Sequence, residues 1–187
     1  MAKDIVYFDL ETQRTANDVG GWANKHKMGM SVGVTYSTAL NEYRIYRESE
    51  VQDLINQLLR ADLVVGFNHI SFDYEVLMAY TIRDLRDQVR SLDLMVDLET
   101  RLGHRLKLDS VATASLGGLS KTADGLDAIR WWQQGKIAEI AEYCCFDVKV
   151  TKCVHEYGVQ NGHVKYLDRT QREQRVDVTW NPQDLRL

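Results

Sequence analysis

The sequence predicts an α/β fold in which a mixed central sheet combines an antiparallel meander with parallel strands and is flanked by helices. Three observations predict this class. Short segments rich in aromatic and β-branched residues open the chain, segments with apolar residues at helical spacing follow, and the two kinds then alternate. The chain of 187 residues has the size of one ordinary domain that buries a core without disulfides.

Three strands are expected first, at residues 4–10, 31–38 and 42–47. Each segment is rich in aromatic and β-branched side chains, and a short polar turn joins the last two, so the three form an antiparallel meander. The stretch 17–30 lies between the first two strands and is interpreted as an insertion.

A helix and a further strand come next. Ser49 is expected to cap a helix over residues 50–60, whose apolar residues fall on one face. A short apolar strand at 63–66 and a second helix at 71–80 follow. Three strands, a helix, a strand and another helix is the opening order of a ribonuclease H-like fold.

The remainder of the chain is expected to be mainly helical. It ends in a long helix over residues 136–157, which Gly158 is expected to terminate. The polar and charged segment 168–187 is interpreted as a tail, which is an arm, a partner contact or a disordered segment. The predicted domain therefore covers residues 1–167.

Composition excludes several classes of protein. A net charge of −4 argues against a protein that coats DNA through bulk electrostatics, because such proteins are strongly basic. The apolar runs are shorter than a membrane span, and the N-terminus lacks the apolar core of a signal peptide. A cytoplasmic location without a membrane partner is therefore expected.

Three cysteines, Cys144, Cys145 and Cys153, fall in one predicted helix. They lack the paired spacing of a zinc site and have no histidine at ligand distance. Because free cysteine is among the most buried residue types, they are expected to be reduced core residues.

Two carboxylates stand at the end of the first predicted strand. Side chains two residues apart on a strand face the same way, so Asp9 and Glu11 project together while Leu10 points to the opposite side. Mg²⁺ and Mn²⁺ prefer oxygen ligands, which makes this pair a candidate cation site. The alternative is that both side chains simply reach solvent where the strand ends.

Two further acidic positions follow. Asp73 lies in the first turn of its helix, where a carboxylate is also favoured by the helix dipole alone, and Asn68 is expected to cap or brace the loop. Asp147 falls within the apolar arc of the last long helix, with Tyr143 one turn earlier on the same side. A carboxyl group buried there must be protonated and neutral, paired with Arg or Lys, or bound to a cation.

Together these motifs resemble the DEDD superfamily of 3′–5′ exonucleases, which includes the proofreading domains of DNA polymerases and ribonuclease D. The matching residues are Asp9 and Glu11 in the first motif, Asp73 after Asn68 and Phe72 in the second, and Tyr143 and Asp147 in the third. The histidine branch of the superfamily places His where this chain has Glu142, so the resemblance is to the tyrosine branch.

The resemblance spans roughly residues 4–160, and the insertion and the tail match no part of the family pattern. The chain also resembles bacterial ribonuclease H-like domains that occur alone or attached to helicases. The partners implied are the 3′ ends of single-stranded DNA or RNA, together with a helicase or another protein.

The activity that the resemblance implies is hydrolysis of terminal phosphodiester bonds of single-stranded DNA or short RNA, which releases nucleoside 5′-monophosphates with two Mg²⁺ or Mn²⁺ ions. Asp9 would bridge both ions, Glu11 and Asp147 would complete the ion that activates water, and Asp73 would serve the second ion. Tyr143 would orient the water or the phosphate, because a phenol that titrates near pH ~10 is a poor base. The implied substrate-binding residues are Leu10, Thr12, Asn68 and Phe72.

Two other functions remain open, namely a ribonuclease H-like endonuclease or resolvase, and a nucleic-acid-binding module of the same fold without catalysis. Of the other acidic residues, Asp93, Asp97 and Glu99 are expected on a helix as solvated or capping positions. Trp131 and Trp132 are expected to pack in a core or a dimer interface, with base stacking as the alternative.

Overall fold

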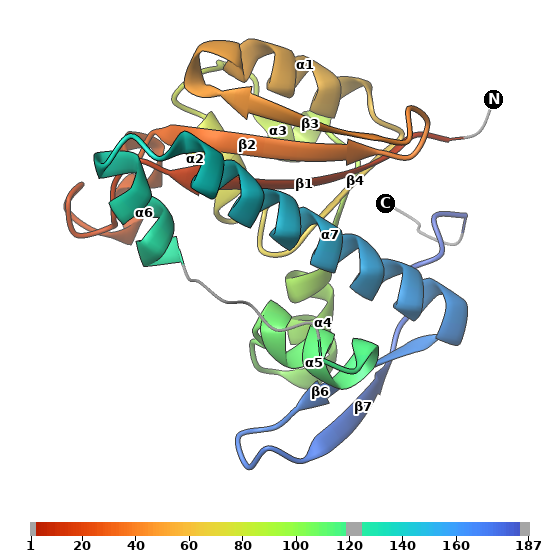
Figure 1. Cartoon of the computed structure of the whole chain (residues 1–187). Helices are drawn as coiled ribbons and strands as arrows, with labels where there is room; N and C mark the ends of the chain where they lie inside the picture. The colour runs from red at the N-terminus through yellow and green to blue at the C-terminus, as the bar shows by residue number, and fades with distance from the viewer. Residues whose placement is uncertain (1–2, 119–124, 184–187) are drawn as a thin grey trace.

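A five-stranded mixed sheet forms the centre of the molecule (Figure 1). The computed structural model describes residues 3–118 and 125–183. The strands of this sheet are β1 (Ile5–Thr12), β2 (Met30–Ser37), β3 (Glu42–Arg47), β4 (Leu63–Gly66) and β5 (Ser91–Asp93). Their spatial order is β3-β2-β1-β4-β5, with β1 antiparallel to β2 and parallel to β4. The predicted fold class is therefore confirmed.

Helices cover both faces of this sheet (Figure 1). They are α1 (Val51–Arg60), α2 (Asp73–Leu77), α3 (Leu85–Gln88), α4 (Leu94–Leu102), α5 (Leu108–Leu116), α6 (Gly125–Gln133) and α7 (Ile137–Asn161). One core joins the sheet to α1 and α2, and a second core joins it to α4, α5 and α7. Among the described helices, none combines the length and the apolar composition required to cross a membrane.

The alternation of side chains along β1 separates the two cores. Phe8 and Leu10 are buried in the core shared with α1, whereas Tyr7 is buried in the core shared with α7. Asp9 and Glu11 continue the face of Tyr7, as the alternation predicts. The apolar half of β1 therefore anchors the strand, and its acidic half emerges next to the helices of the second core.

The start of α1 differs from the sequence prediction, because Ser49 does not cap the helix. A single 3₁₀ turn over Glu48–Glu50 precedes α1, and the N-cap residue is Glu50. The Glu50 carboxylate accepts a hydrogen bond from the backbone N–H of Arg47 at 3.0 Å. Glu50 thus satisfies the N–H group of Arg47, three residues earlier in the chain, and Ser49 remains exposed.

The second helix is shorter than the predicted span of 71–80, since α2 covers only Asp73–Leu77. After α2 the chain turns, and Tyr80 lies beside the start of β2 and the end of β3. The Tyr80 hydroxyl donates to Glu48 at 2.6 Å and accepts from the backbone N–H of Met30 at 3.0 Å. Contacts distant in sequence therefore end the helix where local pattern would continue it.

A hairpin follows α7 and consists of β6 (His163–Leu167) and β7 (Glu173–Asp177), which are antiparallel. Figure 1 shows it beside α5, away from the five-stranded sheet. The predicted boundary at residue 168 lies in the turn of this hairpin, and residues 184–187 of the predicted tail lie outside the described part.

Trp180, which follows the hairpin, is buried against α7. Its backbone carbonyl accepts a hydrogen bond from Nε2 of His155 at 3.2 Å, and its indole N–H donates to Asp97 at 2.7 Å. The chain after residue 168 therefore contributes a large side chain to the second core.

The end of α7 also corrects the sequence prediction, because Gly158 lies inside the helix. The helix continues to Asn161 and ends at Gly162, whose φ of 69° is the left-handed conformation that favours glycine. Gly158 is a packing position instead, since a Cβ there would lie 2.4 Å from Cε3 of Trp180.

Replacing Gly158 with Ala is expected to lower the free energy of unfolding by about 1–3 kcal/mol, because the added methyl group overlaps the Trp180 ring. Glycine to alanine inside a helix otherwise stabilises by up to ~1 kcal/mol, so the sign of the effect is diagnostic. Urea unfolding measures it. Gly125→Ala in α6 is the control, since a Cβ there meets no atom of the described residues within 4 Å. A Gly158→Ala variant at least as stable as the wild type would contradict this packing.

Candidate active site

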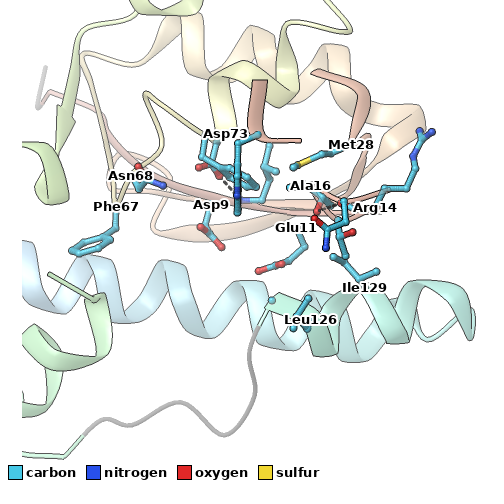
Figure 2. A pocket seen from close by; sticks show the side chains of 17 residues that line it. Asp9, Glu11, Arg14, Ala16, Met28, Phe67, Asn68, Asp73, Leu126 and Ile129 are labelled. Atoms are coloured by element: carbon cyan, nitrogen blue, oxygen red, sulfur yellow. Dashed lines mark hydrogen bonds between the residues drawn. The ribbon is translucent and has the colours of Figure 1, made fainter. Parts of the chain in front are cut away.

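The acidic pair of the first motif lies on the exposed half of β1. Figure 2 shows Asp9 and Glu11 projecting from the same side of the strand, toward the helical layer that contains α6 and α7. One carboxylate oxygen of each residue and Sγ of Cys144 lie within 4.8 Å of one another. The two carboxylates are close enough to share a cation.

Cys144 is the third member of this group and comes from α7. Its thiol donates weak hydrogen bonds to the backbone carbonyl of Asp9 at 3.4 Å and to its carboxylate at 3.5 Å. Burial, followed by the negative charges of Asp9 and Glu11, raises the pKa of this thiol well above its usual value. A protonated thiol is a donor and a poor ligand for a hard cation, so Cys144 supports Asp9 without belonging to a metal shell.

Asp73 is brought to Asp9 by a backbone hydrogen bond. Its carboxylate accepts from the N–H of Leu10 at 3.0 Å, and the side chain is buried. Burial and the negative charge of Asp9 raise the pKa of the Asp73 carboxyl group well above its ordinary value. Asp73 is the first residue of α2 and so lies in its first turn, as expected, yet it also bonds to β1 beyond the last residue of that strand that pairs with β4.

Tyr143 and Asp147 lie one turn apart on α7, and together with Asp9 they line a cavity of about 390 Å³, called the Tyr143 cavity here. Asp147 is buried, in agreement with the predicted arc. Burial, together with the negative charges of Asp147, Glu11 and Asp9, raises the pKa of the Tyr143 phenol. Its hydroxyl therefore stays protonated at neutral pH.

A second cavity of about 690 Å³, the active-site cavity, lies on the other side of Asp9 and is lined by Asp9, Glu11 and Asp73 (Figure 2). The four predicted substrate-binding residues also line it, namely Leu10, Thr12, Asn68 and Phe72. The two cavities share Asp9, Phe67, Asn68 and Gly125. The structure thus gathers all nine predicted residues in one region, while their catalytic, metal-binding and substrate-binding roles stay predictions.

The loop that carries Asn68 has a strained backbone and a buried anchor. Asn68 has a φ of 68°, and its side chain accepts a hydrogen bond from the Ser71 hydroxyl at 2.5 Å. Asp93 is buried, and its carboxylate accepts from the backbone N–H groups of Asn68 at 2.7 Å and Ile70 at 3.0 Å. It also caps α4 by accepting from the N–H of Met95 at 3.1 Å.

Asp93 corrects one sequence prediction and supplies a residue that the prediction missed. It was expected within a helix as a solvated or capping position; the capping is confirmed, and the residue lies directly before the helix and is buried. One signal in the sequence pointed to it, since an Asp directly before an apolar helical pattern is a capping signature. Its second role, across 25 residues to Asn68, depends on the pairing of β4 with β5.

Trp22 is a second residue that sequence reasoning missed. It begins the 3₁₀ helix Trp22–Lys27 within the predicted insertion and lines the active-site cavity. Its side chain is 66% exposed, and its ring centroid lies 6.3 Å from that of Phe72, edge to face. Lys25 donates from Nζ to the backbone carbonyl of Ser71 at 2.6 Å, so the insertion is fastened to the loop of the second motif.

The two adjacent tryptophans of α6 behave as the sequence predicts. Trp131 and Trp132 are half-buried and pack against the core between the sheet and α7. The Trp131 ring lies 6.2 Å from that of Tyr143, edge to face, and therefore supports the position of the phenol.

Comparison with known proteins places the chain in a family. A family model described as the RNase_H superfamily matches residues 6–157, and the chain belongs to that superfamily. Membership supports a nuclease activity in general. No match was found among curated proteins.

Among solved structures, the chain is similar to the family B DNA polymerase from the hyperthermophilic archaeon Pyrobaculum calidifontis. The TM-score is 0.63 at 14% sequence identity, and the match covers 85% of this chain and 25% of the polymerase. The chain thus corresponds to about a quarter of that protein, and similarity at this identity shows the fold alone.

Divalent metal ions are the cofactors that this superfamily implies, and the donor set fits them. The acidic side chains offer oxygen ligands, which Mg²⁺ and Mn²⁺ prefer. The raised pKa of Asp73 has the charge of Asp9 among its causes, and a bound cation would offset that charge. Asp9 and Glu11 are near enough to each other to act on one ion.

Replacing Asp93 with Ala is expected to lower the free energy of unfolding by at least ~2 kcal/mol, because buried N–H groups on both the Asn68 loop and α4 lose their acceptor. Thermal and urea unfolding measure the loss. Asp84→Ala is the matched control, because Asp84 caps α3 at the surface, where water replaces it. We expect about 1 kcal/mol or less for the control. Equal losses in the two variants would show that Asp93 is an ordinary cap.

Proposed function

We propose that the protein is a metal-dependent 3′–5′ exonuclease of the DEDD superfamily, tyrosine branch, which hydrolyses terminal phosphodiester bonds of single-stranded DNA or short RNA. The observation that carries the proposal is the convergence of three sequence motifs on the end of β1. Asp73 reaches this point from α2, and Asp147 reaches it from α7 together with Tyr143. Membership of the RNase_H superfamily supports a nuclease, and the similar fold of a DNA polymerase is in keeping with a nucleic-acid substrate.

Two Mg²⁺ or Mn²⁺ ions would be held by the carboxylates of Asp9, Glu11, Asp73 and Asp147, and would supply positive charge to the attacking water and the departing 3′-oxygen. Within the chain, Asp9 is the central residue of this set. It lies beside Glu11 on β1, contributes to the raised pKa of Asp73, and lines both cavities. This position agrees with the bridging role expected of it.

Tyr143 acts as a hydrogen-bond donor in this proposal. Because burial and three neighbouring carboxylates raise the pKa of its phenol, the hydroxyl holds its proton at the pH of catalysis and is not a general base. Contact with Trp131 holds the ring of Tyr143 in place, and the Asp147 carboxylate lies near its hydroxyl. Its task is to orient the attacking water or the scissile phosphate.

The 3′-terminal nucleoside occupies the active-site cavity in this proposal. Glu11 and Thr12 line one part of the cavity, and Trp22 and Phe72 bring aromatic rings to it. An exposed indole beside a second ring offers a face on which a base of any identity can stack. Recognition of this kind would not depend on sequence.

Labelled single strands incubated with Mg²⁺ test the proposal. A 5′-labelled strand is expected to shorten stepwise with release of nucleoside 5′-monophosphates, whereas a covalently closed circle is expected to survive. Asp9→Asn and Asp147→Asn should each lower the rate by ~100-fold or more, since several kcal/mol of charge stabilisation are lost. Asp53→Asn on the exposed face of α1 is the control and should retain the wild-type rate.

Each alternative function has its own outcome in this experiment. Cleavage of the closed circle would identify a ribonuclease H-like endonuclease or resolvase. Binding of single strands without any hydrolysis would identify a nucleic-acid-binding module. Hydrolysis that persists at the wild-type rate in Asp9→Asn would show that the site is assigned wrongly.

Replacing Trp22 with Ala is expected to raise KM for short single strands about 10-fold with a smaller effect on kcat, because stacking of one base is worth ~1–3 kcal/mol. Trp22→Phe keeps an aromatic face and should recover most of the loss. Steady-state kinetics on a trinucleotide measure both constants. Ile82→Ala, which removes a fully exposed apolar side chain outside the cavity, is the control. A KM unchanged in Trp22→Ala would exclude the stacking role.

A further inference from the structure

We infer that the 5′ part of the bound strand leaves the active site along a third cavity, the hairpin groove, which lies between α5 and the β6–β7 hairpin. This inference rests on the proposed function and extends it to a substrate-binding surface. The groove has a volume of about 770 Å³ and is formed by residues 104–113 on one side and 166–174 on the other. Figure 1 shows these two elements side by side, away from the five-stranded sheet.

The hairpin groove adjoins the cavities of the catalytic residues, because neighbouring cavities have lining residues in common. It shares Lys107 and Asp109 with the Tyr143 cavity. That cavity in turn shares Asp9 and Asn68 with the active-site cavity. The three cavities therefore follow one another, and Asp9 lies between the part proposed for the terminal nucleoside and the part that leads to the hairpin.

Cations line both walls of the hairpin groove. Lys107 precedes α5 and Arg169 lies in the hairpin turn, and both are exposed without an ion pair or side-chain hydrogen bond within the described residues. Arg105 lies on the same wall as Lys107 and is exposed, although it contacts Glu99 at 3.1 Å. These three cations lie close together although the net charge of the chain is −4.

Two carboxylates, Asp109 and Asp168, also line the groove. Asp168 is committed to its own turn, because it accepts hydrogen bonds from the Thr170 hydroxyl at 2.7 Å and from the Gln174 amide at 3.0 Å. These bonds, chiefly the one from Thr170, lower the pKa of Asp168 to about 2, so it stays ionised. The lining thus holds three cations and two carboxylates, and within the described part of the chain Lys107 and Arg169 have no competing partner.

The groove has a fixed width because the hairpin is hydrogen-bonded to α5. The Ser110 hydroxyl donates to the backbone carbonyl of Leu167 at 2.8 Å and accepts from its N–H at 3.1 Å. Ser115 makes the same pair of bonds, both at 2.9 Å, with Lys165. The two walls that carry Lys107 and Arg169 are thus joined by hydrogen bonds.

A phosphodiester backbone is the occupant that this chemistry favours. Most lining residues carry polar or charged side chains, and Arg105, Lys107 and Arg169 offer positive charge to phosphates. Tyr166, the aromatic residue of the lining, is 8% exposed and offers little face for a base to stack on. The groove would therefore hold the strand by its phosphates and without sequence preference.

Binding of a labelled oligothymidylate of ~12 nucleotides, measured in EDTA at several salt concentrations, tests the groove separately from hydrolysis. The Lys107→Gln/Arg169→Gln variant should bind more weakly, and its slope of log affinity against log salt should be smaller by about 1.4, because each phosphate contact on a single strand contributes ~0.7. The Lys107→Arg/Arg169→Lys variant keeps both charges and should retain the wild-type slope.

The matched control is Arg60→Gln/Arg83→Gln, which removes two exposed cations on the α1 side of the sheet that have no ion-pair partner among residues 3–118 and 125–183. A wild-type protein that fails to bind the strand, a double variant with the wild-type slope, or an equal change in the control would each overturn the groove. If the slope falls as expected but the wild type hydrolyses no strand, the groove stands and the exonuclease proposal fails. If the wild type hydrolyses the strand but the double variant keeps the wild-type slope, the exonuclease proposal stands and the groove fails.

Discussion

Repulsion among carboxylates at the end of β1 is the constraint on which the rest of the site depends. Asp9 and Glu11 share one side of the strand, and Asp73 is held next to Asp9 by the N–H of Leu10. Burial and the negative charge of Asp9 together raise the pKa of Asp73, so repulsion adds to the cost of its charged form. Such an arrangement persists because the apolar half of β1 is anchored in two cores, and a divalent cation is the ligand that would offset its charge.

The surrounding structure holds these groups in place through long-range contacts. Asp93 fixes the loop of Asn68 from the neighbouring strand, and Lys25 ties the insertion to the same loop. On the other side, α7 carries Tyr143 and Asp147, and its far end is packed against Trp180. The helix α7 thus links the catalytic residues to the hairpin that forms one wall of the hairpin groove. Catalysis and binding of the strand would therefore depend on the same helix.

Those features of the fold that depend on local pattern could be predicted from the sequence. Alternation along β1 placed Asp9 and Glu11 on one face, and helical periodicity placed Asp147 in the buried arc of α7. Features that depend on distant partners could not be predicted. Gly158 resembles a helix end until Trp180 is seen against it, and Trp22 gains a role only because its helix lies beside Phe72. The helix α2 ends early because Tyr80 bonds to Glu48 and Met30.

Counting bound Mn²⁺ tests the central claim most directly, because it asks whether these carboxylates form a cation site without relying on any substrate. Titration followed by the EPR signal of free Mn²⁺ is expected to show two ions per wild-type chain, the number that a two-metal site requires. Asp9→Asn should lose most of this binding, and Asp53→Asn should keep it. Binding that is absent in the wild type, or undiminished in Asp9→Asn, would contradict the account.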